Sequence, residues 1–159
     1  MDFHEYVSGI AEARYTIRKI FRIVEEQAKA AGMEPLEHQA LLQVYGSAQQ
    51  MLQVNSLARR LDIAPAFASR MIRQLEAKKY VRRKPSKTDG RVIEVHMAAA
   101  GREVIRSVDA DVRVHVEYFQ SQLPISSKRT ALSIMAFYVG LELPPEVAAS
   151  LPLARQSTR

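Results

Sequence analysis

The apolar spacing within residues 65–79 constrains the fold of this chain more than any other feature. Pro65 suits the first turn of a helix, because its φ is already helical and its missing N–H needs no partner there. Four apolar residues follow at helical spacings: Ala68, Met71, Ile72 and Leu75. Residues at these spacings share one face of a helix. We therefore expect a helix with this face in a core and the opposite face exposed.

Shorter elements are predicted on both sides of this helix. In chain order they are a helix at 55–61, a turn at 62–64, strands at 80–84 and 92–97, and a turn at 85–90 between the strands. Asn55 or Ser56 is expected to cap the short helix. Residues 47–53 are polar and rich in glutamine, which indicates a surface connection. A helix, a turn, a second helix and a hairpin together make a winged helix-turn-helix.

Positive charge is concentrated in the same segment. Residues 55–91 hold three acidic residues and eleven basic ones: Arg59, Arg60, Arg70, Arg73, Lys78, Lys79, Arg82, Arg83, Lys84, Lys87 and Arg91. The whole chain has 23 basic and 17 acidic residues, so the remainder is slightly acidic. A DNA phosphate backbone attracts a local positive excess on a fold that can enter a groove. The segment is therefore predicted to bind DNA.

Long amphipathic helices are predicted to flank this segment. They span 2–31, 35–46, 99–122 and 126–141. Gly32 is expected to end the first helix, and Pro144 with Pro145 to end the last one. The predicted fold class is mainly α with a small two- or three-stranded β-wing, in one compact domain. Its parts are dimerisation helices at 1–34 and 99–145, a winged helix-turn-helix at 35–98 and a flexible tail at 146–159.

The first and last helices carry wide apolar stripes. The stripe residues are Phe3, Val7, Ile10, Leu132, Met135 and Tyr138. One small domain cannot cover all of them, so a homodimer interface is predicted. Its two-fold symmetry would match a palindromic operator. Packing within one chain is the alternative interpretation.

Composition argues against several other classes of protein. The chain has no cysteine, which excludes disulfides and thiol chemistry and fits a reducing cytoplasm. No apolar run approaches the ~20 residues that span a bilayer, and residues 1–6 lack the basic region of a signal peptide. The four histidines show no HExxH spacing, and no glycine-rich phosphate loop occurs. An enzyme is therefore not predicted and no cofactor is expected. A metal site of His38 with Glu25 or Glu26 is a weaker alternative.

An ordered set of short motifs carries a family resemblance. The motifs are Ser56-Leu57-Ala58-Arg59-Arg60-Leu61, Ser69-Arg70-Met71-Ile72-Arg73-Gln74-Leu75-Glu76, Val81-Arg82-Arg83 and Asp89-Gly90-Arg91-Val92. The set resembles the DNA-binding core of the MarR family of bacterial transcriptional regulators. The flanking helices extend the resemblance to about residues 5–141. It implies a winged helix-turn-helix, double-stranded DNA as a partner and a homodimer.

Three positions depart from the family pattern. Lys79 replaces a glycine after the recognition helix, Met97-Ala98 replaces a Leu-Thr pair, and Ala64-Pro65 replaces a polar cap. A left-handed Lys79 would cost on the order of 1 kcal/mol, and a missing cap costs about 1 kcal/mol. None of the three removes an expected DNA contact. They affect the local precision of the wing and of the helix ends.

The helix at 65–79 is the predicted base reader, with its N-terminal half in the major groove. The residues assigned to DNA here are Ala66, Phe67, Ser69, Arg70, Arg73 and Gln74, together with Ser56 of the preceding helix. Arg70 and Arg73 suit guanine edges or phosphates. Phe67 suits a thymine methyl group, or else packs against the neighbouring helix.

The hairpin is the predicted wing. Three basic residues flank its tip: Lys84, Lys87 and Arg91. A wing tip reaches the adjacent minor groove. The resemblance implies that Arg91 lies there and that Asp89 orients it by an ion pair. Arg82 and Arg83 alternate on a strand, so only one of them can face the DNA.

A small-molecule site is also predicted. Its residues are Arg14, Tyr15, Arg18 and Phe21 on the first helix and His38 and Tyr45 on the second. The resemblance implies a pocket between these helices. Such residues amid apolar walls suit an aromatic acid, a phenolic compound or an aromatic thioester as effector. Alternatively, His38 is a surface or capping residue, and the two arginines make only interface ion pairs.

These observations predict a sequence-specific, ligand-responsive DNA-binding repressor of the bacterial cytoplasm. It would bind a pseudo-palindromic operator as a homodimer. One alternative is a winged helix that serves as a protein-interaction module, although its basic recognition face argues against that role. The other alternative is a nonspecific architectural DNA-binding protein.

Overall fold

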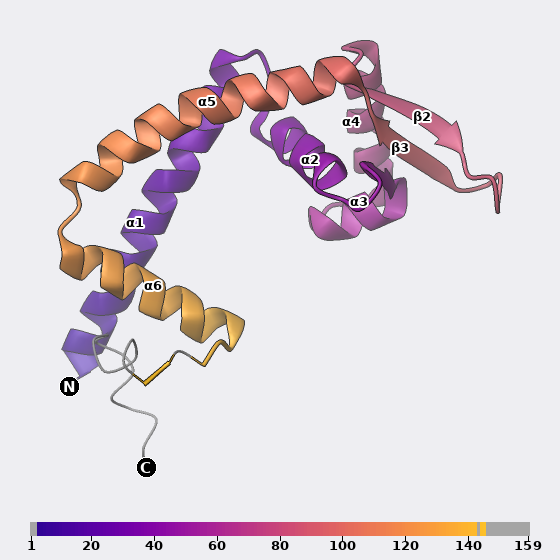
Figure 1. Cartoon of the computed structure of the whole chain (residues 1–159). Helices are drawn as coiled ribbons and strands as arrows, with labels where there is room; N and C mark the ends of the chain where they lie inside the picture. Colours follow the sequence, from indigo (N-terminus) through magenta and orange to yellow (C-terminus); the bar gives the residue numbers. More distant parts are fainter. Residues whose placement is uncertain (1–2, 143, 146–159) are drawn as a thin grey trace. The chain divides into compact units, whose positions relative to one another are not determined.

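The computed structural model describes residues 3–142 and 144–145, which form six helices and a three-stranded sheet (Figure 1). The chain divides into two compact units. We call residues 24–113 the central unit, and residues 1–23 with 114–159 the terminal unit. The boundaries fall inside α1 (Phe3–Ala30) and α5 (Ala99–Gln122), so each of these helices contributes to both units. The mainly α fold with a small β-wing is confirmed.

The predicted boundary between the first two helices is confirmed. α1 ends at Ala30, within one residue of the predicted position, and Gly32 follows it with a φ of +78°. The N–H of Met33 donates to the carbonyl of Ala28, so the chain turns sharply after the helix. α2 (Pro35–Tyr45) then begins with its proline in the first turn.

The helix-turn-helix consists of α3 (Val54–Arg60) and α4 (Pro65–Ala77). The four residues predicted to form the inner face of α4 are all buried. The predicted cap of α3 is wrong: Gln53 occupies the N-cap position, because α3 begins one residue earlier than expected and follows a strand directly. Asp62, with a φ of +54°, forms the turn between the two helices.

α4 ends two residues before the predicted position. Lys78 is its C-cap, and Lys79 is left-handed with a φ of +61°. The N–H of Lys79 donates to the carbonyl of Glu76, and that of Tyr80 to the carbonyl of Leu75. These two bonds close the helix in a Schellman motif, which usually has glycine at the position of Lys79. Lys79, which replaces the glycine of the family pattern, is therefore a residue with a strained backbone.

The sheet has the strand order β1-β3-β2 and is antiparallel throughout. Its strands are β1 (Met51–Gln53), β2 (Val81–Pro85) and β3 (Ile93–Met97). The two predicted wing strands are confirmed within one residue at each end, and their hairpin extends beyond α4 (Figure 1). The interpretation of residues 47–53 as a plain connection is wrong, because Leu52 pairs with Val95 across β1 and β3.

The core of the central unit lies between α2, α3, α4, the sheet and the first half of α5. Its fully buried side chains include Leu41, Leu57, Ile72, Val95 and Val108, one from each of these elements. The inner face of α4 thus packs inward, which leaves the opposite face of the same helix at the surface.

In the terminal unit, α6 (Ile125–Val139) packs closely against α1. A β-carbon added to Gly9 would lie 3.6 Å from Cγ2 of Thr130, and the hydroxyl of Ser127 donates to Oε1 of Glu12 at 2.8 Å. The predicted end of this helix is wrong. α6 stops at Gly140, whose φ of +67° allows the chain to turn before the two prolines.

The exposed large apolar residues gather in the terminal unit. Of those in the described chain, all but Leu42 and Phe67 belong to it: Phe3, Val7, Tyr15, Phe21, Val114, Tyr118, Ile125, Leu132, Met135, Phe137, Tyr138, Val139 and Leu141. Five of the six predicted stripe residues are among them, and Ile10 is half-buried. No helix in the described part of the chain is long and apolar enough to cross a membrane. The predicted tail at 146–159 lies outside the described residues.

Candidate nucleic-acid interface

The outer face of α4 is polar and basic. Its exposed residues are Ala66, Phe67, Arg70, Arg73 and Gln74, and Ser69 is half-buried. The N-cap is Ala64, which offers no side-chain hydrogen bond to the first turn. The helix therefore combines a positive N-terminal end with two arginines on its exposed face. Such a surface suits an anionic partner.

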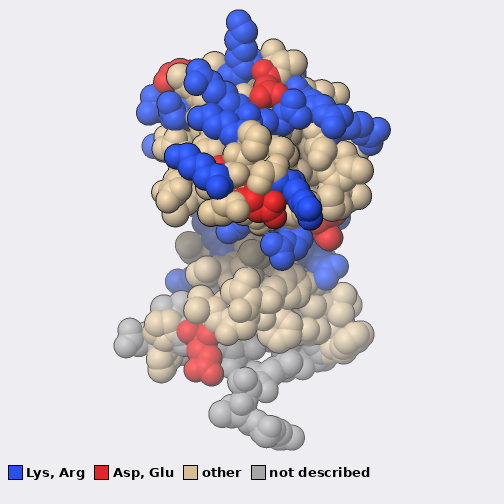
Figure 2. All heavy atoms as spheres, turned by 90° about the vertical axis from the view of Figure 1, so that its right-hand side faces the viewer, with Lys and Arg blue, Asp and Glu red and all other residues tan. Residues whose placement is uncertain are grey.

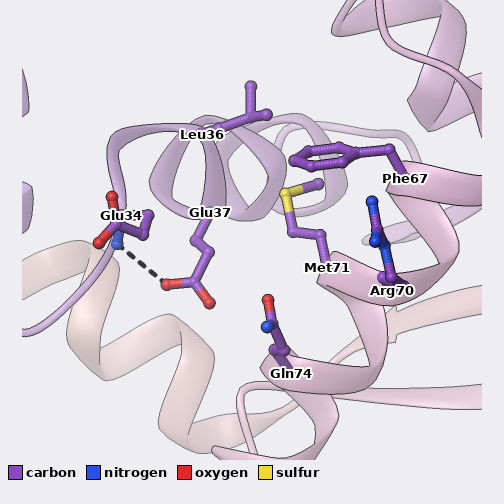
Figure 3. A pocket seen from close by; sticks show the side chains of 7 residues that line it. All are labelled: Glu34, Leu36, Glu37, Phe67, Arg70, Met71 and Gln74. Carbon is purple, nitrogen blue, oxygen red and sulfur yellow. Dashed lines mark hydrogen bonds between the residues drawn. The ribbon is translucent and has the colours of Figure 1, made fainter.

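Phe67 lies at the edge of a cleft between α4 and the first turn of α2. The cleft is lined by Glu34, Leu36, Glu37, Phe67, Arg70, Met71 and Gln74 (Figure 3). The Phe67 side chain is still 42% exposed, and Cζ of Arg70 lies 5.4 Å from its ring centroid. The ring thus has one side toward α2 and another available to a partner, which allows either role expected from the sequence.

Ser56 is half-buried in the first turn of α3. Its hydroxyl accepts a long hydrogen bond of 3.4 Å from the guanidinium of Arg59. Ser56 therefore does not cap its helix but lies beside a basic residue at the surface.

The wing carries its basic residues in the open. Lys84, Lys87 and Arg91 are all exposed. Asp89 accepts the backbone N–H of Arg91 at 3.0 Å, so the contact seen for this carboxylate is with the backbone and not with the predicted guanidinium. An aspartate in this arrangement shapes the turn.

Two of the basic residues in the segment are engaged by carboxylates. Arg83 binds Glu76 with both its backbone N–H, at 2.9 Å, and its Nε, at 2.6 Å. Hydrogen bonds from the backbone and then the side chain of Arg83 hold the pKa of Glu76 below its ordinary value. Nζ of Lys78 lies 2.7 Å from Oε2 of Glu37 and 3.3 Å from the carbonyl of Gly32. Neither pair was predicted from the sequence.

Lysine and arginine side chains nevertheless dominate one face of the molecule. Figure 2 shows them gathered over the side of the central unit that bears α4 and the wing, with few acidic side chains among them. Arg73 and Lys84 form no ion pair with any residue of the described chain. The basic residues predicted from the sequence are therefore exposed together on this face of the central unit.

The residues predicted to bind an effector fall in both units. Arg14, Tyr15, Arg18 and Phe21 belong to the terminal unit. Arg14 donates to the hydroxyl of Tyr138 at 2.8 Å through Nη2 and at 3.0 Å through Nε. Arg18 is exposed, and the exposed ring of Tyr15 has Nζ of Lys19 5.7 Å from its centroid. Arg14 thus already has a partner within its own unit.

His38 and Tyr45 belong to the central unit. His38 is only 4% exposed, so the interpretation of it as a surface residue is wrong. Burial lowers the pKa of its imidazole, and the carboxylate of Asp109 on α5 opposes that effect. Tyr45 is half-buried against the core. Within residues 3–142 and 144–145, no three His, Asp or Glu side chains are grouped as metal ligands.

Solved structures share this fold. The YusO protein of Bacillus subtilis superposes with a TM-score of 0.65 at 21% identity, over 89% of this chain and 100% of that one. A MarR family transcriptional regulator from Streptomyces coelicolor, in complex with DNA, has a TM-score of 0.64 at 21% identity, over 91% and 87%. Wild-type MarR of E. coli in its apo form has a TM-score of 0.67 at 17% identity, over 91% and 98%.

The chain therefore has the winged-helix fold of these structures. The sequence model described as MarR family matches residues 31–92, from the end of α1 to the wing. Over this segment the chain is similar to the MarR family, in agreement with the resemblance seen in the motifs. No curated protein sequence matches the chain.

Proposed function

We propose that this protein is a sequence-specific DNA-binding transcriptional repressor that acts as a homodimer. The observation that carries the proposal is the outer face of α4. This helix buries its four apolar residues in the core of the central unit and turns arginines outward. The wing adds exposed lysines on the same unit, and a structural neighbour of the same fold was solved in complex with DNA.

The proposed reader is the N-terminal half of α4 in the major groove. Arg70 and Arg73 would bind guanine edges or phosphates, and Phe67 would contact a thymine methyl group. Ala66, Ser69 and Gln74 complete the proposed contact surface, with Ser56 of α3 beside it. The helix has no side-chain cap. Pro65 has no N–H and the N–H of Phe67 donates to the carbonyl of Ala64, so the N–H of Ala66 is the one in the first turn that a phosphate could accept.

The wing would act outside the major groove. Lys84, Lys87 and Arg91 would lie along the adjacent minor groove, where negative potential is strongest at narrow A·T steps. Asp89 would support this role by shaping the backbone before Arg91, since it accepts that N–H.

A homodimer is supported by the apolar surface of the terminal unit. Side chains such as Leu132, Met135 and Phe137 are exposed in the single chain, and an apolar surface of this extent usually marks an interface. A two-fold dimer would present two copies of α4 to half-sites about one helical turn apart. The operator would then be pseudo-palindromic.

The proposed regulation is release from DNA by a small aromatic acid, phenolic compound or aromatic thioester. The residues proposed for effector binding are Arg14, Tyr15, Arg18 and Phe21 in the terminal unit, and His38 and Tyr45 in the central unit. Arg18 is exposed, and His38 is buried beside an acidic residue of α5. A neutral imidazole and a charged guanidinium can both donate hydrogen bonds to a carboxylate or a phenol oxygen. A regulator of this kind would work in the bacterial cytoplasm, where the chromosome lies.

Selection of bound fragments from the source genome tests this function. The proposal predicts enrichment of a short motif with two-fold symmetry and half-sites about 10 base pairs apart. The genes beside the enriched sites would then indicate the chemistry of the effector. Recovery of fragments with no common motif would support a nonspecific architectural protein, and recovery of none would support a protein-interaction module.

A further inference from the structure

The recognition helix is tied to the wing at its C-terminal end. Glu76 lies in the last turn of α4, and Arg83 lies on β2. The carboxylate accepts from the Arg83 backbone at 2.9 Å and from its guanidinium at 2.6 Å. A contact that involves both the backbone and the side chain fixes the strand as well as the arginine. The Glu76 side chain is 34% exposed, so water does not fully surround the pair.

A second contact ties the same end of α4 to the start of α2. Nζ of Lys78 lies 2.7 Å from Oε2 of Glu37 and also donates to the carbonyl of Gly32 at 3.3 Å. The Glu37 side chain is only 6% exposed. The same oxygen accepts the backbone N–H of Glu34 at 3.0 Å, which holds the carboxylate in place (Figure 3). Lys78 therefore joins α4 to a fixed point in the turn between α1 and α2.

Within the described part of the chain, the N-terminal half of α4 has no side-chain hydrogen bond or ion pair to another element. Its cap residue is Ala64, and the partner of Arg70 is Phe67 of the same helix. The N-terminal half packs through the buried Ala68 and Met71, whereas the polar contacts lie at the end away from the proposed bases. A reading helix must keep its side chains within about 0.5 Å of the productive position. The contacts made by Glu37 and Glu76 would fix the position of α4, and they leave the exposed residues of its N-terminal half free for DNA.

We propose that Glu37 and Glu76 are positioning residues that hold α4 and the wing in one fixed geometry for DNA. Lys78 and Arg83 belong to the basic segment, but they form ion pairs with these carboxylates and do not neutralise DNA phosphates. This inference rests on the proposed DNA-binding function. Of the two wing arginines, Arg83 is bound by Glu76 of α4. Arg82 is therefore the one that would face the DNA.

Salt dependence separates a positioning residue from a phosphate contact. Each phosphate that a basic residue neutralises contributes about 0.9 to the slope of log affinity against log salt. Lys84→Ala is the matched control, because Lys84 is the next residue on β2 and has no ion pair in the described chain. We expect Lys84→Ala to lower the slope by about one unit on all sequences.

Arg83→Ala should behave differently on the operator selected from the genome. We expect it to weaken operator binding at least about fivefold, the lower end of ordinary coupling between two sites. The salt slope should stay that of the parent, and binding to random DNA should change much less. Circular dichroism and thermal unfolding would check that the variant remains folded.

A charge exchange keeps the test decisive if Arg83→Ala is poorly folded. Glu76→Arg alone and Arg83→Glu alone should both weaken operator binding. The double variant should bind the operator more tightly than either, because it restores the side-chain ion pair but not the acceptor for the backbone N–H of residue 83. If Arg83 contacts a phosphate, the double variant places a carboxylate against the DNA and stays as weak as Arg83→Glu. That result, or a slope lowered by one unit in Arg83→Ala, would overturn this inference while leaving the proposed function intact. A parent protein with no sequence preference would overturn both.

Discussion

The contact between the wing and α5 predicts a large effect for Gly101→Ala. Gly101 lies in the first turn of α5 and is buried. A β-carbon there would lie 2.2 Å from the carbonyl oxygen of Tyr80 and 2.6 Å from Sδ of Met97. The Tyr80 carbonyl also accepts the N–H of Ala98 at 3.0 Å. The added methyl group therefore meets backbone that joins the base of the wing to α5.

Three contributions determine how much Gly101→Ala changes the free energy of unfolding. Overpacking a close contact costs about 1–3 kcal/mol. Loss of the hydrogen bond between Ala98 and Tyr80 adds about 1 kcal/mol. Alanine is better than glycine inside a helix by about 1 kcal/mol. The destabilising effects are larger, so we expect Gly101→Ala to lower the free energy of unfolding by about 1–3 kcal/mol.

Urea unfolding followed by circular dichroism measures this difference. Gly90→Ala is the matched control, because no heavy atom lies within 4 Å of a β-carbon added at Gly90. The control should change stability by no more than about 0.5 kcal/mol. If Gly101→Ala is as stable as the parent or more so, the close approach of α5 to the wing is refuted.

Three further variants test other features. Lys79→Gly should raise the free energy of unfolding by about 1 kcal/mol, because Lys79 has a φ of +61°; Lys79→Ala keeps the β-carbon, and an equal gain there would exclude backbone strain as the cause. Burial lowers the pKa of His38 below 6.5, so the unfolded chain binds a proton more readily and stability should fall as pH drops below 6.5. His38→Gln should flatten this part of the pH curve, and an unchanged curve would assign the slope to another group. Leu132→Arg, at an exposed apolar position, should leave a folded chain that sediments as a 17.9 kDa monomer, whereas the parent sediments as a dimer; a monomeric parent at micromolar concentration would contradict the dimer.

Local patterns in the sequence predicted much of the central unit. The inner face of α4 follows from apolar spacing alone, because residues three and four apart share a helix face. The sharp turn at Gly32 was also predictable, since glycine readily adopts a left-handed conformation after a helix. The strain at Lys79 could be expected for the same reason. Each of these features depends on residues close together in the chain.

Features that depend on distant residues were not predicted. β1 has three residues, too few to show alternation, and it exists because Leu52 pairs with Val95. The ion pair of Glu37 with Lys78 joins positions 41 residues apart. The pair of Glu76 with Arg83 spans only seven residues, but a sequence does not show that a turn brings them together. For this reason the basic segment looked more uniform in the sequence than it is in the structure.

The ratio of operator affinity to random-DNA affinity is the sharpest test of sequence-specific binding by α4. The parent protein would be titrated with its selected operator and with random DNA of the same length at one fixed salt concentration. A sequence-reading α4 predicts affinity for the operator at least about 10³-fold higher than for random DNA. Arg73→Ala should reduce that ratio by about 5- to 150-fold if its guanidinium reads a base, since such a contact contributes about 1–3 kcal/mol. Equal affinity for both DNAs would contradict the claim that this protein is a sequence-specific regulator.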